Sequence, residues 1–495
     1  MTRPWDLSTL LAPWASVASA PEVKGVAQDS RAVTPGSLFL AVRGIREHGL
    51  RYLEQALDNG AVAVAWEPAP GVDVAAVEAA CDRRGVPVTA IDALAENAGA
   101  IAARFHEEPA RALRVVGVTG TDGKTSVTQF IAQALDGREQ RCGVIGTLGW
   151  GFPGTLSASA HTTPDAVTLQ RWLAELRDTG ARSVAMEVSS HALDQARVAA
   201  VPFDVAVLTN LGRDHLDYHG SEAAYADAKR RLFTTGRPRA VLNVDDEFGR
   251  ELFQRRSGDD AVTYSGEGVH GASLRCLQLE LEPGGMRLGL AVGRRRATVR
   301  VPLIGRFNAA NTLAALGALI ALDVPLAEAI DRLSHLKPVP GRMECYRRTG
   351  GPAVIVDYAH TPGALQAALT AAREHFPGRV WVVFGCGGDR DRGKRPLMGA
   401  IARGNAERLV LTNDNPRGEE PERIIADIKA GAGDDDRMRV IPDRHDAIAY
   451  ALSHAAPSDV VLVAGKGHED YQIIGERRLS FSDRDVVSQL LRGIA

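Results

Sequence analysis

Short apolar runs that end in polar residues recur along the chain and predict β-strands. The eight runs lie at residues 113–118, 183–186, 205–208, 240–242, 354–356, 380–384, 409–411 and 460–463. Helical stretches such as 364–376 separate the later runs, which favours parallel sheets. Because the carboxyl ends of parallel strands share one edge of a sheet, the polar residues that follow each run should meet there.

A different pattern occupies residues 261–304. Leu277, Leu279 and Leu281 alternate with polar residues, and the alternation returns over residues 286–292 after a Pro-Gly-Gly turn. Period-2 alternation on both sides of a turn predicts a β-hairpin meander, to which we assign a structural role.

The glycine-rich segment 117–126 lies between a predicted strand and a predicted helix. It has the form G-x-x-G-T-x-G-K-T, with Val118 where the strict phosphate-loop pattern has glycine. Backbone N–H groups at such a turn point toward an anion, and the helix N-terminus adds partial positive charge. Lys124 can reach terminal phosphates and Thr125 can offer its hydroxyl to Mg²⁺. The segment predicts a site for ATP or GTP.

Polar residues on the same expected sheet edge are candidates to complete that site. Glu187, Asn210 and His215 each follow a predicted strand. A buried carboxylate needs a cation or hydrogen-bond donors, so Glu187 and His215 are candidate Mg²⁺ ligands. Histidine is the less expected of the two because Mg²⁺ prefers oxygen. The alternative is a capping glutamate and a hydrogen-bonded core histidine.

Pattern and punctuation divide the chain into three expected α/β domains. Residues 1–97 predict a small α/β domain. Residues 98–337 predict a central domain like a P-loop ATPase, with a mostly parallel sheet and the meander. A Pro- and Gly-rich linker at 337–341 leads into residues 338–495, whose repeated strands predict a Rossmann-like domain.

Composition excludes several classes of protein. The 495 residues carry 58 basic and 61 acidic side chains, a net charge of −3, which does not favour nucleic acid or membrane surfaces. Five scattered cysteines without a C-x-x-C pair argue against a disulfide framework or a zinc knuckle. No apolar run is long enough to span a bilayer and no signal core follows the first residues. We therefore expect a cytoplasmic protein without membrane insertion.

The polar clusters after residue 338 carry charges of both signs. Arg390, Arg417 and Lys466 are cationic, and Asp414 and Glu469 are anionic. Such a site suits a zwitterion such as an amino acid, because arginine matches a carboxylate in bidentate fashion while carboxylates pair with an ammonium. An ATP site together with an amino-acid site suggests ATP-driven amide bond formation, in which a phosphorylated carboxylate is attacked by an amine.

The motifs together resemble the Mur ligases of peptidoglycan synthesis over essentially the whole chain. The motifs that carry the resemblance are 29–31, 117–125, 162–165, 186–191, 210–220, 341–344, 357–362, 387–396, 414–417 and 465–472. The resemblance implies a UDP-binding first domain and, as substrates, ATP, UDP-MurNAc-L-Ala-D-Glu and meso-2,6-diaminopimelate, joined through an acyl phosphate. It also implies Mg²⁺ as cofactor, and we expect a monomer.

The resemblance also assigns residues to each substrate. For ATP it implies Gly120, Thr121, Asp122, Gly123, Lys124, Thr125, Ser126, Asn308, Asn311, Arg342, Asp357 and His360. For the UDP-MurNAc-dipeptide it implies Gln28, Ser30, Ile45, Arg46, Glu47, Thr162, Thr163, Ser189, Gln195 and Arg197. For diaminopimelate it implies Arg390, Asp414, Asn415, Pro416, Arg417, Gly465 and Glu469. By pattern alone, Ser30 belongs to a turn, and Asn308 and Asn311 either cap a helix or reach a base.

Catalysis would rest, by the same resemblance, on Lys124, Glu187, His215 and Lys229. Metal ions would be held by Thr125, Glu187, His215 and Lys229. Lys229 aligns with a lysine that the family carbamylates to N6-carboxylysine, whereas its pattern alone predicts a lysine on a helix surface. Carbamylation turns a cation into a carboxylate-like ligand, which reverses an unfavourable charge beside Mg²⁺.

The run 414–417, Asp-Asn-Pro-Arg, matches the family's signature for meso-diaminopimelate. Diaminopimelate has a second carboxylate that Arg417 and Arg390 can bind, and lysine lacks it. The alternatives are the same ligase with L-lysine, a folylpolyglutamate synthetase-like ligase, or a non-catalytic nucleotide-regulated binding protein. Two departures from the family are Asp122, where asparagine is common, and His161, to which we assign no substrate contact.

Overall fold

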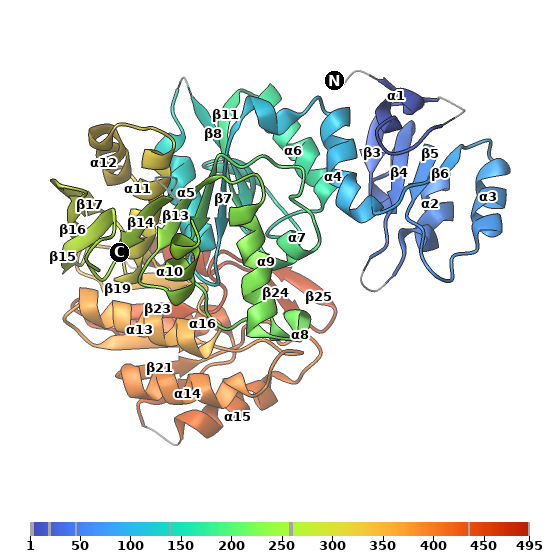
Figure 1. The fold of residues 1–495 in the computed structure, drawn as a ribbon. Coiled ribbons are helices and arrows are strands. Elements are labelled where there is room, and N and C mark those ends of the chain that lie inside the picture. Colours follow the sequence, from blue (N-terminus) through green and yellow to red (C-terminus); the bar gives the residue numbers. More distant parts are fainter. Residues whose placement is uncertain are drawn as a thin grey trace. The chain divides into compact units, whose positions relative to one another are not determined.

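The computed structural model describes residues 4–17, 21–44, 47–138, 140–256, 261–433 and 436–493. Figure 1 shows the elements as a ribbon. The chain forms two compact units, the first made of residues 1–264 and 314–325 and the second of residues 265–313 and 326–495. The domain boundaries expected at residues 97/98 and 337/338 stay a prediction.

A small parallel sheet opens unit 1. Its strands are β3 (Gly25–Ala27), β4 (Ser37–Ala41), β5 (Ala61–Trp66) and β6 (Val88–Ala90), in that order. The helical segments around it are η1 (Ser30–Ala32), η2 (Gly49–Tyr52), α2 (Leu53–Asp58), α3 (Val74–Asp82) and α4 (Leu94–Phe105). Leu38 and Leu40 face one core and Phe39 faces another, so β4 is buried on both sides. This explains its unbroken apolar sequence.

A short strand pair precedes that sheet. β1 (Trp5–Asp6) and β2 (Glu22–Val23) are antiparallel, and α1 (Leu7–Leu11) follows β1. Asp6 caps α1 by accepting a hydrogen bond from the backbone of Thr9.

A larger sheet forms the second part of unit 1. The strand order there is β10-β9-β8-β11-β7-β12-β13-β14, in which β8, β11, β7, β12, β13 and β14 run parallel. The strands are β7 (Arg114–Thr119), β8 (Arg141–Gly146), β9 (Gly149–Phe152), β10 (Thr155–Ser157), β11 (Ala181–Glu187), β12 (Val205–Leu208), β13 (Arg239–Asn243) and β14 (Ala261–Ser265). The runs predicted at 113–118, 183–186, 205–208 and 240–242 are confirmed as β7, β11, β12 and β13.

Helices cover this sheet. They are η3 (Pro109–Ala112), α5 (Lys124–Leu135), α6 (Ala166–Asp178), α7 (Ser190–Asp194), α8 (Leu216–His219), α9 (Glu222–Thr234) and α10 (Glu247–Gln254). Among them, α5, α7 and α10 begin shortly after the ends of β7, β11 and β13. Helices α6, α9 and α10 share one core with Val115 and Val184 of the sheet, while α5 packs on β8 and β11. The polar residues at the strand ends are thereby gathered beside the starts of α5 and α7.

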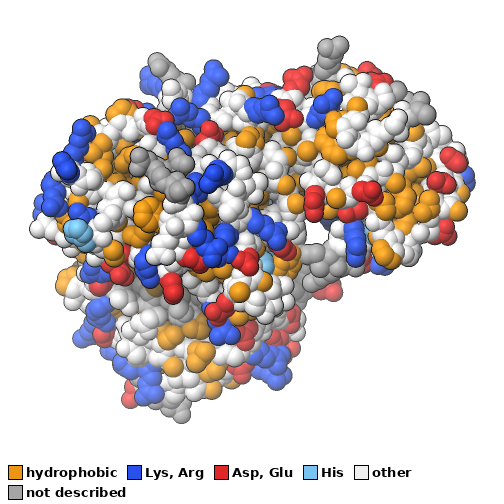
Figure 2. Space-filling view, in the orientation of Figure 1, with side chains coloured by type: hydrophobic (Ala, Val, Ile, Leu, Met, Phe, Trp, Pro, Cys, Tyr) orange, Lys and Arg blue, Asp and Glu red, His pale blue; other side chains and the backbone are white. Residues whose placement is uncertain are grey.

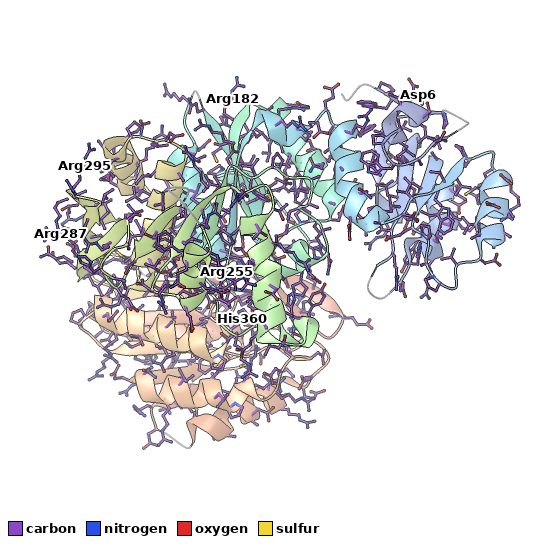
Figure 3. All side chains as sticks on the ribbon, viewed as in Figure 1. Asp6, Arg182, Arg255, Arg287, Arg295 and His360 are labelled. Atoms are coloured by element: carbon purple, nitrogen blue, oxygen red, sulfur yellow. The ribbon has the colours of Figure 1, made fainter. Side chains whose placement is uncertain are left out.

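Unit 2 begins with the predicted meander. β15 (Leu274–Glu282), β16 (Gly285–Val292) and β17 (Arg295–Val301) are antiparallel neighbours. One detail of the prediction is wrong, because a bulge between Cys276 and Gln278 turns Leu277 outward, where 41% of it is exposed. Lys and Arg side chains gather over this meander in Figure 2. Arg287 and Arg295 point away from its strands in Figure 3.

The rest of unit 2 is a three-layer arrangement around a second parallel sheet, of order β18-β19-β23-β20-β21-β22 with β18 antiparallel to β19. The strands are β18 (Glu344–Tyr346), β19 (Ala353–Asp357), β20 (Val380–Phe384), β21 (Arg408–Leu411), β22 (Met438–Val440) and β23 (Val460–Ala464), with a hairpin of β24 (Tyr471–Ile474) and β25 (Arg477–Ser480). The helices around this sheet are α13 (Pro362–His375), α14 (Lys394–Asn405), α15 (Pro421–Ala432), α16 (Arg444–His454) and α17 (Asp483–Gly493). α12 (Leu326–Ser334) packs on β17, and α11 (Phe307–Ala321) has its first residues in unit 2 and the rest in unit 1.

Alternation along these strands assigns their two faces. Ile355 and Val382 pack with α13, α14 and α15, whereas Val354 and Val383 pack with α16 and α17 (Figure 1). The four strands predicted after residue 338 are confirmed as β19, β20, β21 and β23. Their polar clusters therefore share one edge of the sheet. Within the described residues, no helix combines the length and apolarity that crossing a bilayer requires.

Candidate functional site

The phosphate loop of unit 1 connects β7 to α5. Gly120 has a φ of +151°, and a Cβ there would lie 1.8 Å from Thr209 Oγ1. Gly123 has a φ of +81° and precedes α5 without a side-chain cap, so Asp122 does not cap this helix. Instead, the backbone N–H of Asp122 donates to Asn210 Oδ1 at 2.9 Å. The glycines thus allow the backbone conformation of the predicted loop, and Asn210, after the end of β12, holds the loop in place.

Glu187 lies directly beneath this loop and is 2% exposed. Its Oε2 accepts from the hydroxyls of Thr125 at 3.0 Å and Thr147 at 3.1 Å, and its Oε1 accepts from the Thr147 N–H at 2.8 Å. Gly146 makes room for the carboxylate, because a Cβ there would lie 2.3 Å from Oε1. The pairing of Thr125 with Glu187 gives an oxygen-only donor set, which is the kind that Mg²⁺ prefers.

Two lysines converge on one carbonyl of the loop. Lys124 Nζ donates to Gly120 O at 2.9 Å, and Lys229 Nζ donates to the same oxygen at 2.7 Å. Lys229 is 1% exposed on α9, so the pattern-based expectation of a surface lysine is wrong. Burial, reinforced by the nearby charge of Lys124, holds the pKa of the Lys229 ammonium well below its usual value.

Tyr225, one turn before Lys229, connects the helix to the loop. Its hydroxyl lies 3.1 Å from Thr121 Oγ1, and the Lys229 ammonium lies 4.5 Å from the centre of its ring. Burial raises the pKa of Tyr225 to about 12, so the phenol stays protonated. Its spacing of four residues from Lys229 on a helix was the signal that could have identified it.

His215 is at the start of α8 with a φ of +52° and a half-exposed side chain. Its Nε2 lies 3.4 Å from Asp214 Oδ2, and its ring packs edge-on against His191 at 4.8 Å and Tyr225 at 6.3 Å. His215 therefore belongs to the surroundings of the loop. In the described part of the chain it shares no hydrogen bond with Glu187.

A cavity of about 970 Å³ lies in unit 1 beside this centre. Of the residues expected to bind the UDP-MurNAc-dipeptide, it is lined by Gln28, Ser30, Glu47, Gln195 and Arg197. Ser30 is buried behind the cap that Asp29 supplies to η1, and its hydroxyl donates to Gln55 Oε1 at 2.7 Å. Ile45 and Arg46, also expected there, lie outside the described residues. His161, to which no contact was assigned, lines the cavity as well.

The other three expected residues lie between the cavity and Glu187. Arg197 donates to Thr163 O at 2.9 Å, and the Thr163 hydroxyl donates to Glu187 O at 2.8 Å and accepts from Ser189 N. Thr162 Oγ1 lies 3.0 Å from Thr147 Oγ1. These bonds form a continuous connection from the cavity wall to the phosphate loop.

Unit 2 contains the remaining residues expected around the nucleoside. Asn308 Nδ2 donates to Ile304 O and its Oδ1 accepts from Asn311, so Asn308 organises the start of α11. Asp357 accepts from the backbone of Met343 at 2.7 Å and of Ala359 at 2.9 Å. Burial raises the pKa of Asp357, although nearby Arg342 opposes that effect.

Arg342 and His360 flank the same tyrosine. The Arg342 guanidinium lies 4.5 Å from the centre of the Tyr358 ring, and its buried Nε has no hydrogen-bond partner among the residues that the structure describes. The exposed ring of His360, labelled in Figure 3, packs against Tyr358 at 4.6 Å, and its Nδ1 lies 2.8 Å from Tyr358 O. The structure thus brings Arg342, Asp357 and His360 together around the end of β19.

The residues expected to bind diaminopimelate lie on three loops at one edge of the unit 2 sheet. Arg390 follows β20, the run 414–417 follows β21, and Gly465 and Glu469 follow β23. Gly388 N donates to Asn415 O at 2.9 Å, which joins the first two loops. Asn415 Nδ2 donates to Glu469 Oε2 at 3.0 Å, which joins the second to the third.

Arg417 has a φ of +54°, and its Nη1 donates to Gly388 O at 2.9 Å. The loop approaches so closely that a Cβ on Gly387 would lie 2.8 Å from that Nη1. The same holds at Gly465, whose φ is +119° and whose added Cβ would lie 2.5 Å from Asp414 Oδ2. Arg390 is exposed and its Nη1 donates to Asp389 O at 3.2 Å.

Three buried cations support these loops, and the sequence did not predict that they are buried. Arg395 and Arg444 are fully buried. Arg395 donates to Glu419 and to Gly387 O. Arg444 donates to Asp483 and to Ala464 O. Lys466, expected to face a substrate, is also fully buried. Nothing in the pattern marks such residues, because buried and exposed arginines look alike in a polar segment.

Comparisons with known proteins match this architecture. Three family models cover successive parts of the chain: the Mur ligase family catalytic domain at residues 22–117, the Mur ligase middle domain at 118–319, and the Mur ligase glutamate ligase domain at 341–467.

Curated relatives and a solved structure extend the match to nearly the full length. The UDP-N-acetylmuramoyl-L-alanyl-D-glutamate–2,6-diaminopimelate ligase of Alkalilimnicola ehrlichii is 56% identical over 98% of both chains. The enzyme of that name from Pseudomonas aeruginosa is 48% identical over 95% of both. A solved structure with the same name is 35% identical, covers 99% of both chains and superposes with a TM-score of 0.71. The chain therefore belongs to the Mur ligase family.

Proposed function

We propose that this protein is the ATP-dependent ligase that adds meso-2,6-diaminopimelate to UDP-MurNAc-L-Ala-D-Glu, a step in peptidoglycan precursor synthesis. The observation that carries the proposal is the hydrogen-bonded connection from the cavity through Thr163 and Glu187 to Thr125 of the phosphate loop. It links a site large enough for a nucleotide sugar to a site for nucleotide phosphates. The names of the relatives at 56% and 48% identity support the substrates.

The proposed reaction has two steps, the formation of an acyl phosphate and the attack of an amine on it. A carboxylate oxygen of D-glutamate attacks the γ-phosphorus of ATP and ADP leaves, giving an acyl phosphate. The amine of diaminopimelate then attacks the acyl carbon, phosphate leaves with the C–O bond electrons, and the nitrogen loses a proton. Little covalent chemistry falls to the protein, so its part is positioning and charge neutralisation.

The backbone of Gly120 to Ser126 in unit 1 would hold ATP. Lys124 would then donate to phosphate oxygens in place of the loop carbonyls to which it donates in this structure. Thr125 and Glu187 would hold Mg²⁺, and their oxygens 3.0 Å apart fit that ion. When bound, Mg²⁺ would neutralise part of the phosphate charge. Asn308, Asn311, Arg342, Asp357 and His360 are proposed for the nucleoside.

Lys229 and His215 would complete this centre. Burial lowers the pKa of Lys229, which favours the neutral amine, and the neutral amine is the form that adds carbon dioxide to give a carbamate. Carbamylation would place an anion beside Lys124, whose positive charge disfavours an ammonium at Lys229. His215 is proposed as a further ligand at the rim of the centre, since its half-exposed ring contacts Tyr225.

The charges of unit 2 support an amino acid with two carboxylates. Asp414 and Glu469 would pair with ammonium groups, and Arg417 with Arg390 would bind the distal carboxylate that lysine lacks. A lost charge-assisted hydrogen bond costs about 1.5–3 kcal/mol, or roughly ten- to a hundredfold in selectivity.

The experiment is a steady-state assay of phosphate release with ATP and UDP-MurNAc-L-Ala-D-Glu, comparing meso-diaminopimelate with L-lysine. We expect a kcat/KM preference for diaminopimelate of about ten- to a hundredfold. The Arg417→Met variant should lose most of that preference, while Arg373→Met, on the solvent-facing pair with Glu407, should keep it. A wild-type preference for lysine would reject the assignment.

We further propose that the enzyme acts in the cytoplasm and as a monomer. Its free cysteines, of which Cys81, Cys142, Cys276 and Cys386 are buried, support a reducing compartment. Sedimentation of the active enzyme should give a mass near 52.8 kDa, and about twice that mass would contradict the monomer.

A further inference from the structure

The ammonium of Lys466 occupies a closed position inside the amino-acid site of unit 2. The residue follows β23, between Gly465 and Gly467, and is 0% exposed. Its Nζ donates to Glu469 Oε2 at 3.0 Å and to Asn415 Oδ1 at 3.2 Å. The ring of Tyr471 covers it, with its centre 5.4 Å from Nζ. A cation enclosed in this way is directed at protein groups and is withdrawn from solvent.

These contacts fix the orientation of the Asn415 side chain. Its Oδ1 accepts from Lys466 Nζ and from the Ile473 N–H at 3.0 Å, so two donors hold the oxygen in place. The amide nitrogen then faces Glu469 Oε2 at 3.0 Å. Turning the amide over would set its N–H₂ against two donors and its oxygen against a carboxylate, which is unfavourable on both sides.

Glu469 is arranged by the same lysine. Its Oε2 receives both the Lys466 ammonium and the Asn415 amide, and the side chain is 15% exposed. A carboxylate that receives two donors on one oxygen is held in one rotamer, with its remaining acceptor capacity directed elsewhere. Both residues to which Lys466 donates, Asn415 and Glu469, belong to the set proposed for diaminopimelate.

We propose that Lys466 is a positioning residue that acts on amino-acid binding through Asn415 and Glu469. It fixes the direction of the amide and the rotamer of the carboxylate, and it does not contact the substrate. This inference rests on the proposed function, because it concerns how the same site recognises its amino acid. The sequence places Lys466 only among the cations of a site suited to a zwitterion.

The test is a double-mutant cycle on the full-length enzyme with Lys466→Met, Glu469→Gln and the two combined. The KM for meso-diaminopimelate and the KM for ATP are measured for each variant, with thermal melting to confirm folding. Lys466→Met should raise the diaminopimelate KM at least about tenfold and leave the ATP KM within about twofold. The combined variant should be no worse than the poorer single variant within about twofold, since the lysine acts through the glutamate.

Two further variants make the test specific. Asn415→Asp keeps Lys466 in place but removes the amide donor to Glu469, so it should also raise the diaminopimelate KM at least about tenfold. If Lys466→Met does not fold, the Asn415→Asp variant tests the proposal in its place. The matched control is Arg373→Met, which breaks an ion pair on the outside of the same unit and should leave both KM values unchanged.

The results distinguish a failure of the proposed function from a failure of the positioning role of Lys466. If the wild-type enzyme does not use diaminopimelate, the proposed function fails. If it does, but the effects of Lys466→Met and Glu469→Gln multiply, then Lys466 acts independently of Glu469 and the positioning role is rejected. An unchanged KM in Lys466→Met, or in Asn415→Asp, also rejects it.

Discussion

At the scale of single residues, the geometry of the site depends on glycines whose backbone lies very close to polar atoms of other residues. Gly120, Gly146 and Gly465 each stand where a Cβ would collide with a polar atom of the site, at 1.8, 2.3 and 2.5 Å. Their small size allows loops and carboxylates to come into contact. They are as much a part of recognition as the charged residues beside them.

Gly465→Ala tests this at the amino-acid site. The added Cβ would press on Asp414 Oδ2, and the φ of +119° would strain any side chain by about 1–3 kcal/mol. We expect the KM for diaminopimelate to rise at least about tenfold while the ATP KM changes little. Gly404→Ala in α14, where an added Cβ meets nothing within 4 Å, is the control. Unchanged amino-acid kinetics in Gly465→Ala would contradict the role of Asp414.

Lys229→Ala tests the proposed carbamate. Removing the side chain should reduce kcat by at least about a hundredfold, because the centre loses an anion. Short carboxylates such as acetate should restore part of the rate by occupying the vacated space. The measurement is the rate of phosphate release against acetate concentration, with Arg230→Ala, next in sequence and partly exposed, treated in parallel. Full activity of Lys229→Ala without acetate would show that no carbamate is needed.

At the scale of elements, helix starts and strand ends hold the site together. In unit 2, α16 and α17 meet at a bidentate ion pair between Arg444 and Asp483, with both bonds at 2.7 Å and both side chains fully buried. Arg444 also donates to Ala464 O at the end of β23. One guanidinium thereby fastens two helices to the strand that precedes Gly465.

Arg444→Met should destabilise unit 2 strongly, because it leaves the Asp483 carboxylate buried without its partner. Breaking a buried pair in this way costs about 3–5 kcal/mol. Denaturant unfolding monitored by near-ultraviolet circular dichroism measures the loss. Arg373→Met, whose ion pair with Glu407 is half-exposed, should cost less than about 1 kcal/mol. A similar, small loss in both variants would mean that the buried pair contributes little.

Much of the element layout could be predicted because strand runs and turn residues are local signals. The strands that end at Glu187, Asp357 and Leu411 followed from apolar runs, and the phosphate loop from its glycines. β8 and β9 were missed because glycines interrupt their apolar residues, and β10 was missed because it has only three residues. Thr147, at the turn between β8 and β9, was missed with them, although it donates two of the bonds to Glu187.

Depth of burial was harder to predict than the identity of the site. Lys229 and Lys466 lie in polar segments that resemble surface segments, yet they are 1% and 0% exposed. What buries them is packing between elements distant in the sequence, as when α9 brings Lys229 against Gly120 O. No local pattern carries that information.

At the scale of the whole molecule, buried histidines make stability depend on pH. Burial lowers the pKa of His106 in unit 1 and of His468 in unit 2 to about 4, from about 6.5 in the unfolded chain. Between those values the unfolded chain binds more protons than the folded one. Stability is therefore complete above pH 6.5 and falls as the pH drops toward 4.

Calorimetric melting between pH 7.5 and 4.5 measures this effect. We expect the melting temperature to fall progressively below pH 6.5. His106→Gln should flatten that fall, because one of the groups that must remain neutral is gone. His270→Gln, at an exposed position, should leave the slope as it is. A melting temperature that stays constant from pH 6.5 to 4.5 would be inconsistent with burial of neutral imidazoles.

The guanidinium of Arg417 has a consequence for attempts to redesign the enzyme. Its bond to Gly388 O ties the loop after β21 to the loop after β20, whichever amino acid is present. Replacing Arg417 to admit a different amino acid therefore also removes one of the bonds between those loops and leaves the bond from Gly388 N to Asn415 O. An engineered variant with a new specificity needs a second change that supplies a donor to Gly388 O.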